Sequence, residues 1–464
     1  MMSDSRRAFL KSAAATAVGA MAPRLEAESE RRPNFVFFLG EGARADEFGF
    51  AGSRLIRTPN FDRLAREGMV FRNAFTTNSL CSPSRASILT GLYSHATGVP
   101  DNRPNAIPDN LPIVTDLLRQ AGYDVGIFGK VHVHDLSKRN WDSYFGIDAA
   151  GANYYHAAIT ESANGIVSPA KQYDGYFDDV TAGRAVEWLN QKREKPFCLF
   201  LWFLAPHAPF YRARRHADLY NGLGIPKPKT FDDDLKGYPG KPRAFLEGMS
   251  KFVTGGYGSD DPRSLEELVK DHYAGVIATD DNAGRILDAL EQARALDDTA
   301  IVFSSDHGFF LGEWGLYNKM LMHEPSIRVP LTVRYPRLIK PGAVCDRMAL
   351  NIDIAPTILD LAGVKLPERM HGRSLVPLLK QDTATNWRMD WLYEYYDERY
   401  AAKSRGIRTE RYKLIHYWEA PEEFEFYDLE ADPGELENLY GNQRYAGTIE
   451  ELKNRMNRLR AETA

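Results

Sequence analysis

The stretch Cys81-Ser82-Pro83-Ser84-Arg85 combines a thiol, a proline and a guanidinium group in a spacing that suits the chemistry of a small anion. The residues after Cys81 fit the first turn of a helix, which the sequence continues as far as Gly91. Cys81 would then lie beside the free backbone N–H groups of a helix N-terminus, where an anion is stabilised. Arg85, one turn further on, adds a planar cation suited to sulfate or phosphate. A buried cysteine that only packs is the alternative.

Other polar side chains follow buried apolar segments that read as strands. They are Glu41; Lys130, His132 and His134; His207, between two Ala-Pro pairs; Asp306 and His307; and, thirteen residues after Asp306, Lys319. The extended spacing of Lys130, His132 and His134 predicts that these three point to one side. Each side chain alone has an ordinary structural reading. Together they place carboxylates, imidazoles and ammonium groups near one helix start that is suited to an anion.

The order of apolar runs and helical patterns predicts an α/β fold in which helices sandwich a large, mainly parallel sheet. Predicted strands are 34–40, 123–129, 197–205, 300–306 and 328–335, and predicted helices include 60–68, 113–122 and 273–293. Chemistry in such a fold lies at the carboxyl ends of the strands. From about residue 385 the pattern changes to an antiparallel meander over 389–396, 403–418 and 424–433, followed by a helix over 448–461. A long polar surface loop is expected over 226–245.

The motifs CSPSRASILTG, GKVH, APHAP and SDHGFFLGEWGLYNK, followed by SIRVPLTVRYP, occur in this order along the chain. In this order they resemble the formylglycine-dependent sulfatases of the alkaline-phosphatase-like superfamily, above all the bacterial glycan sulfatases of iduronate and glucosamine type. The resemblance extends from about Asn34 to the tail that ends in FYDLEADPGELENL. It implies a catalytic domain over 33–380 and a smaller C-terminal subdomain, an antiparallel sheet plus a helix, over 381–464.

The resemblance also implies a site. Cys81 would be oxidised to formylglycine by a formylglycine-generating enzyme, and its hydrate would be the nucleophile. The residues that hold the nucleophile and the sulfate would be Arg85, Lys130, His132, His207 and Lys319. The ligands of a divalent cation, usually calcium, would be Glu41, the converted Cys81, Asp306 and His307.

The chemistry explains these residue types. A serine would remain as a stable sulfate ester, whereas an aldehyde hydrate keeps a second hydroxyl whose deprotonation expels sulfate. His132 is the expected base, Lys319 or His207 the expected proton donor to the leaving alcohol, and the cations meet the developing charge.

One departure from the family pattern affects the metal ligands. Sulfatases usually carry two adjacent aspartates after the first strand, whereas this chain has Glu41-Gly42 there. Glu41 would replace one oxygen ligand, and Gly42 offers none. We expect Asp46, or a water molecule, to complete the site.

Two alternative functions share these residues. A phosphate or phosphonate ester hydrolase of the same superfamily would have the same fold, and a protein that binds sulfated glycans without catalysis would explain the loss at Gly42. For the sulfatase, we expect a sulfated small molecule or carbohydrate as the substrate. The residues considered for a sugar subsite are Asn153, Tyr154, Tyr155 and His156, with His134 and His371.

Composition narrows the class of protein. The chain has 464 residues, 44% of them hydrophobic, which is enough for a large buried core. A net charge of −5 does not suggest a general polyanion or nucleic-acid binder. Three cysteines are too few for a disulfide framework, and we expect no Cys198–Cys345 bridge.

Residues 1–30 carry a distinct signal. Ser5-Arg6-Arg7-Ala8-Phe9-Leu10-Lys11 precedes a mild Ala-rich run that is too short to span a membrane stably. We interpret the segment as a twin-arginine signal peptide, read by the twin-arginine translocase and cleaved after Ala22 or Ala27. An ordinary basic N-terminal arm is the alternative. The signal implies a bacterial protein exported to the periplasm or the exterior.

Overall fold

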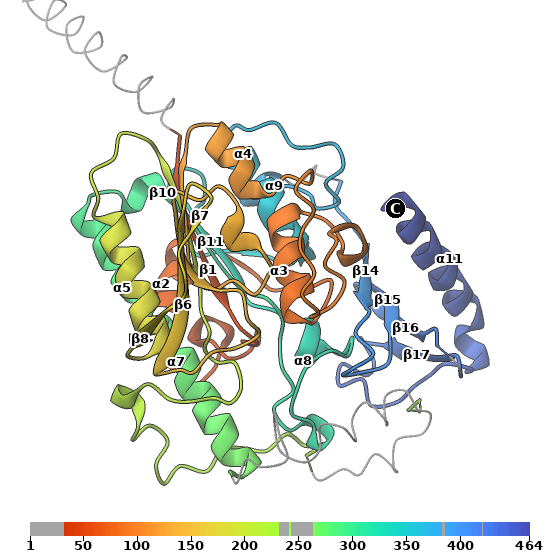
Figure 1. Cartoon of the computed structure of the whole chain (residues 1–464). Helices are drawn as coiled ribbons and strands as arrows, with labels where there is room; N and C mark the ends of the chain where they lie inside the picture. The colour runs from red at the N-terminus through yellow and green to blue at the C-terminus, as the bar shows by residue number, and fades with distance from the viewer. Residues whose placement is uncertain (1–31, 232–240, 243–262, 383–385, 420) are drawn as a thin grey trace, which may run out of the picture. The chain divides into compact units, whose positions relative to one another are not determined.

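The computed structural model describes residues 32–231, 241–242, 263–382, 386–419 and 421–464 (Figure 1). The predicted signal peptide over 1–30 lies outside these residues, and so does much of the predicted loop over 226–245. Residues 34–464 form one compact unit. The predicted division between residues 380 and 381 stays a prediction.

An eleven-stranded mixed sheet is the centre of this unit. Its strands are β1 (Asn34–Gly40), β2 (Met69–Phe71), β4 (Asp124–Lys130), β5 (Ser143–Ile147), β6 (His156–Ala163), β7 (Ile166–Val167), β8 (Lys171–Asp174), β9 (Phe197–Trp202), β10 (Thr299–Ser305), β11 (Leu331–Arg334) and β12 (Ala343–Cys345). Their order is β12-β2-β11-β10-β1-β9-β4-β5-β6-β7, with β8 paired to β6. The predicted strands β10, β1, β9 and β4 are parallel, as is their neighbour β5, which was not predicted. The predicted strand β11 runs antiparallel to β10, and β6 runs antiparallel to β5.

Helices cover both faces of the sheet (Figure 1). One core contains side chains from α3 (Cys81–Thr90), α4 (Val114–Gln120), α9 (Ile354–Leu361) and α10 (Val376–Leu379). The other contains side chains from α2 (Pro59–Glu67), α5 (Phe177–Leu189) and α7 (Leu265–Gln292). Along β1, Phe35 and Phe37 belong to the first core, and Val36 and Phe38 to the second. A strand buried on both faces must be apolar throughout, which explains why its sequence shows no alternation.

The C-terminal part is a four-stranded antiparallel sheet followed by a helix, as predicted. Its elements are β14 (Asp390–Tyr395), β15 (Ser404–Thr409), β16 (Tyr412–Tyr417), β17 (Glu423–Asp428) and α11 (Ala446–Glu462). The helix buries Ile449, Leu452, Met456 and Leu459, which recur at helical spacing. The remaining described strands are β3 (Ala74–Phe75) and β13 (Ala349–Leu350), which pair with each other. The remaining described α-helix is α8 (Glu324–Ile327). None of the helices described is long and apolar enough to cross a membrane.

The register of the parallel strands decides which polar groups meet. Gly40 at the end of β1 lies opposite Ser305 at the end of β10, so that Glu41 and Asp306 leave the sheet side by side. Trp202 at the end of β9 pairs with Gly129 in β4, which brings the segments carrying His207 and Lys130 to the same edge. The chain therefore assembles the polar strand ends at one edge of the sheet, as parallel pairing requires.

Candidate active site

Helix α3 begins at Cys81, as predicted, and is buried over its whole length. Its end is set by Gly91, whose φ of +70° places it in the left-handed region that favours glycine. The Cys81 side chain is 1% exposed. All three cysteines are free, so that the expected absence of a Cys198–Cys345 bridge is confirmed.

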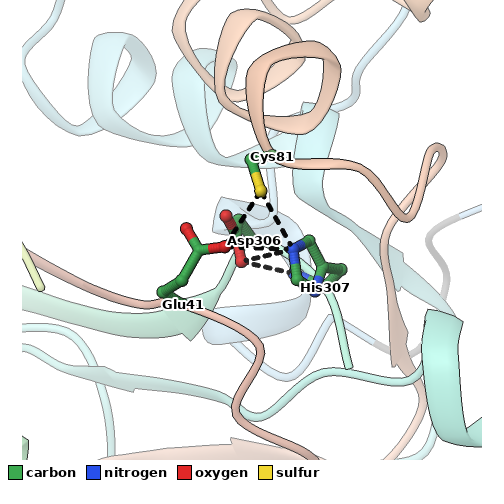
Figure 2. A group of neighbouring side chains, drawn as sticks. All are labelled: Glu41, Cys81, Asp306 and His307. Atoms are coloured by element: carbon green, nitrogen blue, oxygen red, sulfur yellow. Dashed lines mark hydrogen bonds and ion pairs between the residues drawn. The ribbon is translucent and has the colours of Figure 1, made fainter. Parts of the chain in front are cut away.

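Four side chains from three segments converge on one point at the start of α3 (Figure 2). Their ligand atoms, from Glu41, Cys81, Asp306 and His307, all lie within 4.8 Å of one another. The Cys81 thiol donates to Glu41 Oε1 at 3.0 Å, and Cys81 Sγ lies 3.6 Å from His307 Nε2. His307 Nε2 is also 3.4 Å from Glu41 Oε1 and 3.4 Å from Asp306 Oδ1. These are the four residues that the sequence predicts as metal ligands.

Arg85 holds the two carboxylates in place. It donates through Nη2 to Glu41 Oε2 at 2.6 Å and through Nε to Asp306 Oδ2 at 3.0 Å, and its Nη1 donates to the Lys130 carbonyl. One oxygen of each carboxylate is thereby occupied. The other oxygen of each, Glu41 Oε1 and Asp306 Oδ1, faces His307. A single guanidinium fork therefore aligns the donor set.

Two buried lysines complete the positive surroundings of Cys81. Lys319 Nζ lies 3.0 Å from Cys81 Sγ and 3.2 Å from Glu41 Oε1, and Lys130 Nζ lies 2.9 Å from Glu41 Oε2. Burial raises the pKa of Glu41, but Lys130, Lys319 and Arg85 outweigh it and hold that pKa well below its usual value. Burial and Glu41 raise the pKa of the Cys81 thiol, yet the two lysines and a hydrogen bond with His132 bring it well below normal. The cluster thus stabilises negative charge at position 81.

The imidazoles differ in what they can do. His307 Nδ1 donates to the Gly308 carbonyl at 2.8 Å, so Nε2 is the nitrogen that faces the carboxylates. His207 Nδ1 likewise donates to the Ala208 carbonyl at 2.5 Å, and its Nε2 lies 3.9 Å from Glu41 Oε1. Burial and then the charge of Lys130 lower the pKa of His207 to about 4. Burial also lowers the pKa of His132, whose buried Nδ1 has no hydrogen-bond partner within the described chain.

The donor chemistry fits a divalent cation. Glu41 Oε1, Asp306 Oδ1 and His307 Nε2 converge, and burial together with the charge of Glu41 raises the pKa of Asp306 to about 6. A cation between them would remove that repulsion. Carboxylate oxygens are the preferred ligands of hard cations such as calcium, whereas an imidazole nitrogen such as that of His307 also ligates transition metals.

Two expectations at this edge are wrong. His134 does not join Lys130 and His132 because the chain turns at His132, whose φ is +50°; the His134 side chain is 48% exposed and lies 3.5 Å from Asp135. Asp46 does not complete the metal site, since its carboxylate is bound by Arg44 through two contacts of 2.9 Å.

Gly42 is not a simple loss of a ligand. Its φ is +76°, its N–H donates to Asp306 Oδ1 at 3.1 Å, and an added Cβ would meet the ring of His307 at 3.4 Å. Glycine here lets the backbone approach the donor set and hold one of its oxygens.

The residues considered for a sugar subsite have other contacts. Tyr154 is buried, and its hydroxyl donates to the His207 carbonyl at 2.6 Å, so that it positions that loop. His156 pairs with Asp174 at 2.7 Å, and His371 accepts the Tyr93 N–H at 3.1 Å. None of these contacts brings them to the Cys81 cluster.

Several supporting residues could not be predicted from local sequence patterns. Ser84 donates to the Asp306 carbonyl at 2.6 Å and accepts from Asn351 at 3.0 Å. Asp178 accepts the N–H groups of Leu204 and Ala205 at 2.7 and 2.9 Å, which holds the segment that leads to His207. Only Ser84 lies inside a motif, and its role depends on a partner 222 residues away.

Two family models match this chain. The family model described as Sulfatase matches residues 33–364, and the one described as N-sulphoglucosamine sulphohydrolase, C-terminal, matches residues 312–462. The chain is 33% identical to an N-acetylglucosamine-6-O-sulfatase of Bacteroides thetaiotaomicron, over 92% of this chain and 86% of that protein. It is 30% identical to a choline-sulfatase of Rhizobium meliloti, over 89% and 83%.

Solved structures of other proteins share the fold of this chain. A protein in complex with its substrate D-glucosamine-2-N,6-O-disulfate superposes with a TM-score of 0.83 at 32% identity, over 93% of this chain and 98% of that chain. A phosphonate monoester hydrolase of Agrobacterium radiobacter superposes with a TM-score of 0.76 at 24% identity, over 93% and 96%, and shares the fold.

Proposed function

The chain belongs to the sulfatase family and is a sulfuric ester hydrolase, and we propose that it removes the 6-O-sulfate of a glucosamine-type sugar. The observation that carries the proposal is the convergence of two carboxylate oxygens, one imidazole nitrogen and three buried cations on Cys81. The choice of sugar is supported by the N-acetylglucosamine-6-O-sulfatase relative and by the structure with a glucosamine disulfate, each above 30% identity.

The proposed catalyst needs two groups beyond the encoded side chains. Cys81 would be converted by a formylglycine-generating enzyme, and the hydrated aldehyde would supply a nucleophilic hydroxyl and a second hydroxyl whose ionisation expels sulfate. Glu41, Asp306, His307 and the converted residue 81 would hold a divalent cation, calcium being our first choice; when bound it polarises sulfate oxygens and favours the ionised nucleophile.

The remaining steps belong to the chain's own residues. Arg85 would hold the metal ligands in place, because its Nε donates to Asp306, its Nη2 to Glu41 and its Nη1 to the Lys130 carbonyl. Lys130 and Lys319 would meet the charge that develops on the sulfate. His132 would accept a proton from residue 81, with which it makes a hydrogen bond, because its lowered pKa keeps it neutral near pH 7.

Lys319 is the better candidate for protonating the leaving alcohol. The Lys319 ammonium lies 3.0 Å from Cys81 Sγ. His207, with a pKa of about 4, carries no proton to give near neutrality, and its Nε2 would instead orient groups near Glu41.

The test is sulfate release. Protein co-produced with a formylglycine-generating enzyme is incubated with N-acetylglucosamine 6-sulfate, N-acetylglucosamine 3-sulfate and N-acetylglucosamine 6-phosphate, and free sulfate or phosphate is measured by ion chromatography. Release from the 6-sulfate that is lost in Cys81→Ala supports the proposal. Preferred release of phosphate would favour the phosphate or phosphonate hydrolase, and binding without release would favour a glycan-binding protein.

Export through the twin-arginine translocase is proposed on the Ser5–Lys11 motif alone. Fractionation of bacteria that produce the wild-type chain or Arg6→Lys together with Arg7→Lys tests it. Wild-type protein in the periplasm, and variant retained in the cytoplasm, are the expected results. Retention of the wild-type chain would contradict the proposal.

A further inference from the structure

The phenol of Tyr393, on β14, joins two segments of the active site. Its hydroxyl donates to the Met320 carbonyl at 2.7 Å and lies 2.7 Å from the hydroxyl of Ser79. A carbonyl only accepts and a phenol carries one proton, so Ser79 must donate to the phenol oxygen. Met320 directly follows Lys319 in the chain, and Ser79 lies two residues before Cys81. One hydroxyl group therefore ties the backbone next to Lys319 to the segment that leads into α3.

This bridge is buried and is anchored by the C-terminal sheet. β14 is an edge strand of that sheet and lies on the side of α3 (Figure 1). The backbone N–H of Glu394, the next residue on the strand, donates to the Thr77 carbonyl at 3.0 Å. Tyr393 and Ser79 are both 0% exposed. Burial raises the pKa of the Tyr393 phenol, which therefore keeps its proton and remains a donor.

The backbone at Met320 has a conformation that needs support from its surroundings. Its φ is +85°, in the left-handed region that residues other than glycine rarely adopt. Such a conformation persists where neighbouring groups hold it. On the other side of Lys319, its own backbone N–H donates to Asn318 Oδ1 at 3.0 Å. The hydrogen bond from Tyr393 therefore fixes the backbone of Lys319 on its C-terminal side.

The position of that backbone decides where the Lys319 ammonium lies. Nζ is 3.0 Å from Cys81 Sγ and 3.2 Å from Glu41 Oε1, at the end of a long side chain with many rotamers. When the alcohol leaves, the nucleophile at residue 81 binds sulfur and the bond from sulfur to the ester oxygen breaks. A proton passes from Nζ to that oxygen, which requires the ammonium to be within hydrogen-bond reach of it.

We propose that Tyr393 is a positioning residue that holds Lys319 for its proton transfer to the leaving alcohol. The assignment rests on the donor role of Lys319 in the proposed function. It gives the C-terminal sheet a role in the chemical step as well as in packing.

Three variants separate positioning from packing. Tyr393→Phe removes the hydroxyl and keeps the ring, and Lys319→Met removes the proton donor itself. Tyr417→Phe is the matched control, because Tyr417 is a buried tyrosine of the same sheet whose hydroxyl donates to Glu425 at 2.6 Å.

The readout is the dependence of kcat/KM on the leaving group. For wild type and the variants, kcat/KM is measured on phenyl sulfate and on 4-nitrophenyl sulfate. Phenol is a weaker acid than 4-nitrophenol, so its departure gains more from a proton donor. The ratio of the two values does not depend on the fraction of enzyme that is folded, because both substrates report on the same molecules.

The proposal predicts that Tyr393→Phe lowers kcat/KM on phenyl sulfate roughly 10-fold more than on 4-nitrophenyl sulfate. Lys319→Met should change the ratio in the same direction by more, and Tyr417→Phe should leave it at the wild-type value. Equal losses on both substrates in Tyr393→Phe, or no loss, would overturn the proposal. So would a change in Tyr417→Phe as large as that in Tyr393→Phe. If Tyr393→Phe yields no folded protein, Ser79→Ala decides, and an unchanged ratio there would overturn the proposal.

The same measurements distinguish this inference from the proposed function. A wild-type ratio in Lys319→Met would show that Lys319 is not the donor, and its proposed role would fail together with the inference. A changed ratio in Lys319→Met beside a wild-type ratio in Tyr393→Phe would overturn the inference alone. Wild-type enzyme that cleaves both aryl sulfates but not N-acetylglucosamine 6-sulfate would refute the proposed substrate, and the aryl comparison would still decide the role of Tyr393.

Discussion

Two of the buried clusters of charged side chains in this protein differ in the balance between their cations and their carboxylates. The catalytic cluster sets the cations Arg85, Lys130 and Lys319 against the carboxylates Glu41 and Asp306. The C-terminal cluster sets Lys241, Arg408 and Lys413 against Glu324, Glu425 and Glu435. Among these lysine, arginine and carboxylate groups the first cluster has one cation in excess and the second has none. Burial lowers the pKa of His307, but Asp306 outweighs it and raises that pKa to about 9, which adds further positive charge to the first cluster.

The C-terminal cluster satisfies its charges internally. Lys413 lies 3.0 Å from Glu324 and 2.5 Å from Glu435, and it donates to the Met322 carbonyl at 2.8 Å. Burial raises the pKa of Glu324, but Lys413 and Arg408 outweigh it and bring that pKa to about 2. The arrangement fixes β16 against the segment that precedes α8, and its charges are directed at one another.

The charge of the catalytic cluster is instead balanced by the group that the cluster binds. In the encoded chain the surrounding lysines lower the pKa of the Cys81 thiol and so favour a negative charge at position 81. Conversion of that thiol to an uncharged aldehyde would remove it and leave the excess positive charge for a sulfate ester. A balanced buried network thus supports structure, and an unbalanced one supports binding and catalysis.

The largest expected effect is on activity, from Asp306→Ala. Asp306 supplies one of the two carboxylates that converge on His307, so its removal should lower sulfate release by roughly 1,000-fold or more while circular dichroism stays unchanged. Asp346→Ala, at an exposed carboxylate, is the matched control. Chelated enzyme, verified to be free of metal and still turning over at its original rate, would contradict the metal-dependent account.

In the C-terminal cluster, Lys413→Met should act on stability. The change leaves Glu324 and Glu435 buried without their shared cation, which costs about 3–5 kcal/mol in the free energy of unfolding. Urea denaturation measures it. The sulfatase activity of the molecules that remain folded should stay close to wild type; an activity loss as large as that of Asp306→Ala would mean that the two clusters are not separate in function.

A smaller effect is expected at Gly42, where the double change Glu41→Asp with Gly42→Asp restores the usual family pattern. The sequence predicts tighter metal binding unless the backbone needs a positive φ, and the φ of +76° meets that exception. We expect no gain in calcium affinity by calorimetry and a stability loss of about 1–2 kcal/mol from strain.

Gly363→Ala is the control for Gly42, because Gly363 has a φ of +69° and no atom within 4 Å of an added Cβ. Gly363→Ala should lower stability through the same backbone strain and leave calcium affinity unchanged. Tighter binding in the double variant would mean that Gly42 is a true deficit.

The smallest expected stability change is that of Lys319→Met, measured in the Cys81→Ser background where no thiolate is present. Removing Lys319 still leaves Arg85, Lys130 and the protonated His307 against Glu41 and Asp306, so the free energy of unfolding should be unchanged or raised. This is the opposite of Lys413→Met, although both lysines are buried. A loss comparable to that of Lys413→Met would refute the charge-balance argument.

The sequence predicted the centre of the fold because β1, β4, β9 and β10 are buried on both faces and leave unbroken apolar runs. It did not find β6, which lies next to the edge strands β7 and β8 and in which exposed and buried residues alternate over the first four positions. The metal-ligand set and the start of α3 followed from ordered motifs, and the structure brings those residues together.

Other features depend on contacts that no local pattern encodes. The turn at His132 separates His134 from the cluster, and Arg44 captures Asp46. From the sequence, Lys413 on β16 would be interpreted as a solvent-exposed strand residue. Its partner Glu324 lies 89 residues earlier in the chain, so no local pattern reveals the buried ion pair.

The central claim is that the cluster around Cys81 exists to make and use an aldehyde at that position. The most direct measurement is the mass of the peptide that carries Cys81, from protein co-produced with a formylglycine-generating enzyme, together with sulfate release by the same sample. The account predicts that a CHO group replaces the CH2SH group and that activity rises with the converted fraction. Full activity in protein whose Cys81 is entirely unmodified thiol would contradict it.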